Sequence, residues 1–185
     1  MGLIKKPFSG LVKIKDYVTR RGQSVPMDLD SAVLNELGAQ AIDYVQRTTG
    51  IEPKCHDIRQ RENRTALYNA LIEWENSNLK TSDYNVRAEE RNRILRDGGN
   101  LSDVLIQKNA VCRELSIFGH LVSTFYGLKN LVVNGNLSNE YSGAHTWLLT
   151  GGRSTVVDPG YFKGCVDAAS YPAETISEQE LVRLR

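Results

Sequence analysis

A histidine and an aspartate stand on either side of a Gly-Gly pair in the segment GAHTWLLTGGRSTVVDPG, residues 143–160. Both flanks are rich in β-branched and aromatic residues, which is typical of half-buried strands. A two-residue turn at Gly151-Gly152 would place His145 directly opposite Asp158 on one sheet face, with Cβ atoms roughly 4.5–5.5 Å apart. A carboxylate at that separation can orient an imidazole, so the segment predicts a His–Asp pair.

Cys112 is the group on which such a pair could act. It lies in KNAVCREL, in the first turn of the most apolar predicted helix, about residues 110–126. Exposed N–H groups and the helix dipole favour a thiolate there, and Asn109 is predicted to cap that turn. Asp158 would orient His145, His145 would take and return the proton, and Cys112 would attack a carbonyl carbon.

An acyl-transfer site also needs donors for the oxyanion that forms during attack. The backbone N–H of Cys112 is expected to supply one donor, and Gln107, Asn109 and Trp74 remain open as sources of a second. Trp147 alternates onto the face of His145. It is expected to shield the imidazole, to line the acyl site or simply to pack.

Cys112 opening an apolar helix, then Gly143-Ala144-His145-Thr146-Trp147, then Asp158-Pro159, resembles the transglutaminase-like superfamily of papain-related cysteine enzymes. The resemblance covers about residues 101–161. It implies an α+β core in which the nucleophile helix packs on a small antiparallel sheet. It also implies a Cys-His-Asp thiol hydrolase or acyl transferase that works without a cofactor or metal.

The resemblance leaves the reaction and the substrate open. A main-chain amide attacked by water would make a protease, a glutamine side chain attacked by water a deamidase, and a lysine acceptor a transglutaminase. Hydrolysis of protein or peptide amides is the preferred prediction, since no acidic calcium-like cluster appears. The alternatives are an acyltransferase, an inactive transglutaminase-like binding module, and an enzyme held by a regulatory protein partner. A compact protein of this kind is also similar to bacterial effector enzymes.

The pattern of elements predicts an α+β fold with its helices first and a small antiparallel sheet afterwards. Residues 1–25 are expected to form an N-terminal tail or edge segment, and residues 26–185 a single catalytic domain. Within that domain we expect a helical part over 26–108, the Cys-helix and sheet core over 109–162, and a C-terminal helix over 175–185. The last expectation rests on Ser177 and Glu180, which have capping-box spacing.

The composition mainly excludes classes of partner and of cellular location. The 185 residues carry 23 Lys and Arg against 22 Asp and Glu, so nothing in the charge favours nucleic acid or an anionic membrane as partner. No apolar run approaches the roughly 20 residues of a membrane helix, and the first residues are not a Sec signal. We therefore expect a cytoplasmic protein, or one exported into a host cell by a non-Sec route.

Three widely spaced cysteines fit neither a disulfide framework nor a Cys-x-x-Cys metal site. Cys55-His56-Asp57 is predicted to be a polar loop rather than a metal site, and Cys165 to serve packing or to lie in a loop. His120 is predicted to make a helix–sheet contact, because it stands about 12 Å along the helix from Cys112.

Overall fold

The computed structural model of the chain describes residues 4–19, 22–81, 83–138, 143–161 and 163–185. Its α-helices are α1 (Ala32–Thr49), α2 (Arg61–Asn78), α3 (Tyr84–Arg96), α4 (Leu101–Ile106) and α5 (Cys112–Phe125). Its strands are β1 (Leu11–Lys13), β2 (Tyr17–Val18), β3 (Ser24–Val25), β4 (Asn130–Leu137), β5 (Gly143–Thr150), β6 (Thr155–Asp158), β7 (Gly164–Asp167), β8 (Ala173–Gln179) and β9 (Val182–Leu184). Short 3₁₀ turns are η1 (Phe8–Gly10), η2 (His56–Arg59) and η3 (Ala168–Ser170). The predicted α+β class, with small antiparallel sheets, is confirmed.

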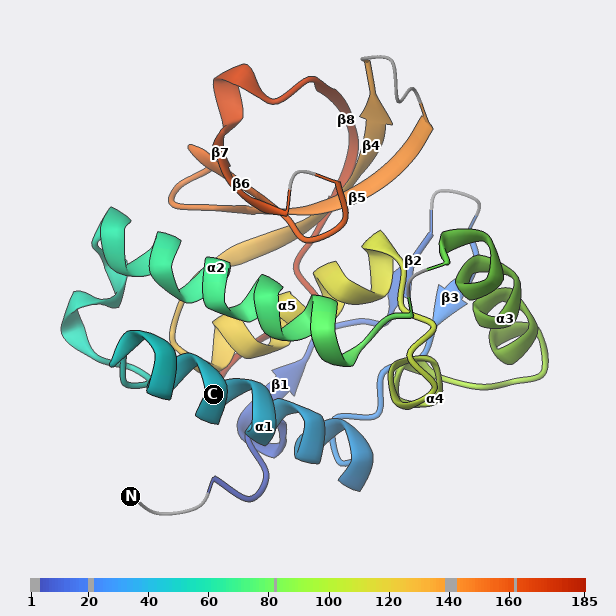
Figure 1. Cartoon of the computed structure of the whole chain (residues 1–185), viewed down its shortest axis with the longest axis horizontal. Helices are drawn as coiled ribbons and strands as arrows, with labels where there is room; N and C mark the ends of the chain where they lie inside the picture. The colour runs from blue at the N-terminus through green and yellow to red at the C-terminus, as the bar shows by residue number, and fades with distance from the viewer. Residues whose placement is uncertain (1–3, 20–21, 82, 139–142, 162) are drawn as a thin grey trace.

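Helix α5 lies at the centre of the molecule, between the main sheet and the other helices (Figure 1). Leu115, Phe118 and Val122 follow the 3.6-residue period along it and are all buried. Phe118 stacks on Trp74 of α2, with ring centroids 5.6 Å apart. The helix that begins at Cys112 is therefore fixed on its apolar side by the largest core of the protein.

The main sheet is antiparallel, with the strand order β7-β6-β5-β4-β8. Val132, Leu148 and Val157 belong to the core shared with the helices. Their neighbours on the other face, Val133 and Trp147, belong to a second and smaller apolar cluster. Because side chains alternate along a strand, both faces of β4 and β5 are covered.

The β5–β6 hairpin differs from its predicted register. Thr150 pairs with Thr155 and Leu148 with Val157, so the connection spans residues 151–154 rather than two glycines. The Arg153 N–H donates to the Thr150 carbonyl at 3.1 Å, which draws Arg153 and Ser154 into the turn. The pairing is shifted by two residues, and a shift of two leaves every side chain on its predicted face.

The predicted C-terminal helix over 175–185 is wrong. Residues 173–179 form β8, which pairs with β4, and residues 182–184 form β9. Capping-box spacing is a local signal, whereas the unpaired edge of β4 offers a full ladder of backbone hydrogen bonds. Tertiary pairing overrides the helical signal here.

Of the two alternatives predicted for the N-terminal residues, a tail or an edge segment, the described part of 4–25 fits an edge segment, since it forms strands of two small sheets. Strand β1 pairs with β9, so the two ends of the chain meet in one small sheet. Phe8 and Tyr17 are both fully buried. Among the residues that the structure describes, no helix combines the length and the apolar character needed to cross a bilayer.

Candidate active site

His145 and Asp158 form a hydrogen bond although the hairpin register was predicted incorrectly. The Nε2 atom of His145 lies 2.9 Å from Oδ1 of Asp158. Continuing the observed register past Leu148–Val157 sets His145 across from Gly160, so the bond runs diagonally over the sheet face. Diagonal neighbours on one face lie within reach of longer side chains.

Asp158 is fully buried and is held by further donors besides the imidazole. The N–H groups of Gly160 and Tyr161 each donate to Oδ1 at 2.9 Å, and the Tyr171 hydroxyl donates to Oδ2 at 2.8 Å. Burial alone would raise the pKa of Asp158, but the bond to His145, its charge and these donors lower the pKa below its usual value. The carboxylate is therefore ionised.

Cys112 meets this pair at Gly160. A methyl group added at Gly160 would lie 3.0 Å from Cβ of Cys112, 3.1 Å from Cε1 of His145 and 3.5 Å from Oδ1 of Asp158. Cys112 is near enough to the imidazole to raise the pKa of His145. Because Nε2 faces Asp158, Nδ1 is the ring nitrogen left for the sulfur.

The charges at the cluster favour a protonated imidazole. Burial lowers the pKa of His145, but the hydrogen bond to Asp158 and the proximity of Cys112 and Asp158 raise it to about 10. His145 is therefore suited to pair with a thiolate on one side and a carboxylate on the other. Stacking on Trp147, with centroids 6.1 Å apart, further fixes the ring.

The start of α5 is held by helix α3. Arg87 and Arg91 of α3 are both buried. Arg87 donates from Nε to the Ala110 carbonyl at 3.1 Å and also binds the Thr81 carbonyl. Arg91 lies 3.5 Å from Glu114, a fully buried carboxylate in the first turn of α5.

Asn109 does not cap this helix, contrary to the prediction. The N-cap position is Val111, whose N–H donates to Oε2 of Glu114 at 3.3 Å. Asn109 instead is buried two residues earlier, where its backbone forms a β-bridge with Lys80. Glu114 therefore accepts the hydrogen bond at the start of the helix that Asn109 was predicted to accept. Arg91 lies beside the Glu114 carboxylate and helps to hold it there.

The remaining candidate oxyanion groups separate in the structure. Gln107 is exposed at the end of α4, and Trp74 is buried against Phe118. Trp147 is packed between His145 and Tyr171, with 5.1 Å between the Trp147 and Tyr171 ring centroids. Its contacts fit the shielding and packing roles. The Cys112 N–H remains a donor candidate, since the first N–H groups of a helix have no partner within it.

Three residues in or beside the cluster were not predicted from the sequence. Gly160 follows Asp158-Pro159 directly, and a glycine in a turn gave no sign that a side chain there would enter the site. Tyr171 stands 13 residues beyond Asp158, outside any motif. Gly135 lies beside His145 on β4 and leaves room for the Trp147 ring, which a Cβ there would meet at 2.3 Å.

The other cysteines and histidines have separate roles. His56 is exposed, and no group of three His, Cys, Asp or Glu side chains in the described part of the chain could hold a metal. Cys165 packs against the core, and burial raises its pKa to about 11. His120 makes the predicted contact from the helix to the sheet, with Nδ1 2.5 Å from Oδ1 of Asn130.

Comparisons with known proteins add no family to this geometry. No family model, no curated protein and no solved structure matches the chain.

Proposed function

We propose that the protein is a cysteine-nucleophile hydrolase that cleaves amide bonds of protein or peptide substrates through a thioester. The observation that carries the proposal is the meeting of Cys112, His145 and Asp158 around Gly160. A thiol at a helix start, an imidazole near it and a buried carboxylate behind the imidazole are the parts that acyl transfer requires. We further propose that the core is transglutaminase-like, in line with the order of the three residues.

Each step of the proposed reaction uses one of these groups. The Cys112 thiolate attacks the amide carbon, and the carbonyl oxygen takes up the electron pair near the Cys112 N–H. The C–N bond then breaks, and the leaving amine or ammonia takes the proton of His145. Water next attacks the thioester while His145 accepts its proton, which releases the carboxylic acid and restores the thiolate.

The test uses a mixture of proteins incubated with the wild type or with Cys112→Ala and compared by mass spectrometry. New chain termini that require Cys112 would identify a protease. A gain of about one dalton at glutamine would identify a deamidase. Cross-links to lysine would show that the protein is a transglutaminase rather than a hydrolase.

Two further variants separate catalysis from folding. Asp158→Asn keeps the shape of the carboxylate but removes its charge, so turnover should fall while the fold is retained. Cys165→Ala removes a cysteine on β7, outside the cluster, and should leave turnover unchanged. Identical spectra for the wild type and Cys112→Ala over broad substrate mixtures would contradict the proposal.

A further inference from the structure

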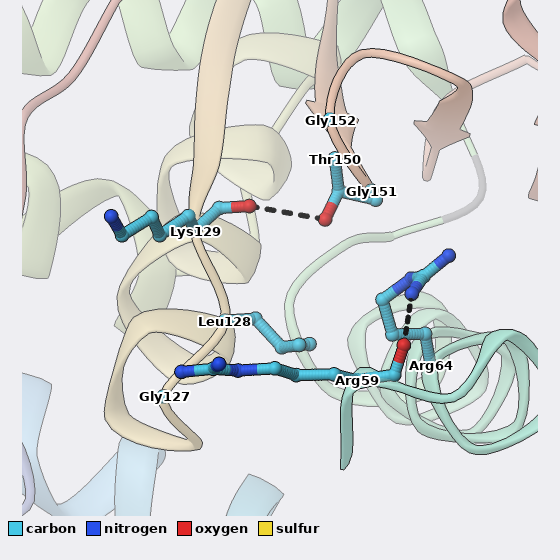
Figure 2. A pocket seen from close by; sticks show the side chains of 8 residues that line it. All are labelled: Arg59, Arg64, Gly127, Leu128, Lys129, Thr150, Gly151 and Gly152. Atoms are coloured by element: carbon cyan, nitrogen blue, oxygen red, sulfur yellow. Dashed lines mark hydrogen bonds between the residues drawn. The ribbon is translucent and has the colours of Figure 1, made fainter. Parts of the chain in front are cut away.

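A hollow of about 340 Å³ lies at the Thr150 end of β5, with Arg59, Arg64 and Lys129 in its lining. Figure 2 shows that the charged ends of these three side chains point away from one another. A small-molecule site needs a few polar groups that converge on the ligand. This hollow does not offer them, whereas the surface beside Cys112 carries a fixed aromatic ring.

The starts of helices α3 and α5 are held in one region of the surface. Residues 79–81 run antiparallel to residues 108–110 and are joined to them by backbone hydrogen bonds of 3.2 and 3.0 Å. The first segment leads into α3, which begins at Tyr84, and the second leads into α5, which begins at Cys112. Few residues separate this pairing from either helix start, and a residue spans at most about 3.6 Å. The first turn of α3 therefore lies near the nucleophile.

The Tyr84 ring rests on a guanidinium that is itself fixed. The central carbon of the Arg87 guanidinium lies 5.8 Å from the centroid of the Tyr84 ring. Arg87 is buried and donates to the carbonyls of Thr81 and Ala110. A cation–π contact with a fixed arginine holds the ring in one orientation. Tyr84 is nevertheless 57% exposed, so part of the ring surface is open to a ligand.

The charges around Tyr84 belong to the start of α5 and to α3. Burial raises the pKa of Tyr84, the charge of Cys112 raises it further, and the charges of Arg91 and Arg113 lower it. Cys112 and these two arginines are thus close enough to the Tyr84 hydroxyl to act on it. A cationic side chain of a substrate would meet like charges here, whereas an aromatic side chain would not.

We propose that Tyr84 determines substrate specificity by packing against an aromatic side chain of the substrate residue whose carbonyl Cys112 attacks. Two aromatic rings gain from offset or edge-to-face contact in addition to the burial of their apolar area. Because the Tyr84 ring is already held by Arg87, little side-chain freedom is lost when the substrate binds. The inference rests on the function proposed above, since it requires Cys112 to be the nucleophile.

The probes are N-acetyl amino acid chloromethyl ketones that carry the side chain of phenylalanine, alanine or lysine, added to the full chain. The Cys112 thiolate displaces chloride, so a C–S bond forms as the C–Cl bond breaks. Mass spectrometry of the peptide that contains Cys112 measures the rate. We expect the phenylalanine probe to label Cys112 about tenfold or more faster than the alanine probe, because the ring is buried against Tyr84. The lysine probe should show no such advantage.

Three variants test the role of the ring through the ratio of the phenylalanine rate to the alanine rate. Tyr84→Ala should lower this ratio to about threefold or less, since the aromatic contact is lost. Tyr84→Phe keeps the ring and should retain the preference of the wild type. Val86→Ala is the matched control, because Val86 is 56% exposed and stands two residues further along α3. It should also retain the preference.

Iodoacetamide, which has no such side chain, separates failure of this inference from failure of the proposed function. Fast iodoacetamide labelling below pH 8, combined with an unchanged ratio in Tyr84→Ala, would overturn the inference and leave the proposed function standing. Equal rates for the phenylalanine and alanine probes, or a lysine probe as fast as the phenylalanine probe, would have the same meaning. An ordinary thiol profile with iodoacetamide would overturn the proposed function and this inference with it.

Discussion

Asp158 is the residue on which the geometry of the cluster depends. Asp158 is fully buried. Its two carboxylate oxygens accept hydrogen bonds from the His145 ring, two backbone N–H groups and the Tyr171 hydroxyl. A buried carboxylate without such donors would take up a proton. The surrounding donors thus keep the charge that orients His145.

The variant Tyr171→Phe tests the contribution of one of these donors, because it removes the hydrogen bond from the Tyr171 hydroxyl to Asp158. Losing a hydrogen bond to a buried carboxylate should reduce the free energy of unfolding by roughly 1.5–3 kcal/mol. Because Tyr171 helps to lower the folded-state pKa of Asp158, its stabilisation is fully present above the unfolded pKa of about 3.9 and is lost as the pH falls through the lower folded-state pKa. Urea unfolding at pH 7 and pH 3 should show a smaller difference from wild type at pH 3 than at pH 7. An equal loss at both pH values would mean that Tyr171 acts through packing alone.

Gly160→Ala tests whether the cluster is as tightly closed as its distances indicate. The new methyl would lie 3.0 Å from Cβ of Cys112 and must push the thiol and the imidazole apart. The rate of Cys112 alkylation at neutral pH should fall on the order of tenfold to a hundredfold. Gly10→Ala is the control, since nothing lies within 4 Å of its added Cβ. Unchanged alkylation in Gly160→Ala, as in the control, would contradict the assembled cluster.

At the scale of elements, local chemistry that can be read from the sequence sets the two ends of helix α1. Helix α1 begins after Ser31, whose hydroxyl accepts from Leu34 N–H, and ends at Gly50 with φ +71°. The register of β5 with β6 was not predictable in this way, because Arg153 could join either the turn or the strand. The His145–Asp158 pair was still predictable, since face alternation survives a two-residue shift. The partners of Asp158 were not, because Tyr171 reaches it only through the folded sheet.

Helix α3 positions the start of α5 through the buried Arg91–Glu114 pair. Arg91→Met leaves Glu114 buried without its partner and should lower the free energy of unfolding by about 3 kcal/mol. The double variant Arg91→Met with Glu114→Leu removes both charges and should recover most of this loss. Urea unfolding of the two variants measures the difference. Additive losses would show that the pair does not couple α3 to α5.

At the scale of the whole molecule, His120 joins parts that are distant in sequence. Its Nδ1–H donates to Asn130 at the start of β4, while its Nε2 accepts from the N–H groups of Leu181 and Val182 at 3.3 and 3.2 Å. Sequence reasoning predicted the contact of this helix residue with the sheet. It could not find the β9 side of the contact, because the C-terminal residues were expected to be helical.

This arrangement predicts a specific acid sensitivity. Burial lowers the pKa of His120 to about 4, so the folded protein keeps the ring neutral while the unfolded chain protonates it near 6.5. Stability from this group is therefore present above pH 6.5 and is lost as the pH falls toward 4, by roughly 3 kcal/mol in total. His120→Gln should have a flatter stability profile than wild type between pH 7 and pH 4, measured by urea unfolding. Parallel profiles would contradict a neutral His120.

The central claim is that His145 and Asp158 activate Cys112. The most direct measurement is the alkylation rate of Cys112 against pH, resolved by peptide from Cys55 and Cys165, in wild type and His145→Ala. We predict fast alkylation that persists well below pH 8 in wild type and is lost at those pH values in His145→Ala, because the imidazolium no longer stabilises the thiolate. An ordinary thiol profile in wild type, or the same profile in both proteins, would contradict the claim and favour a binding module with this fold.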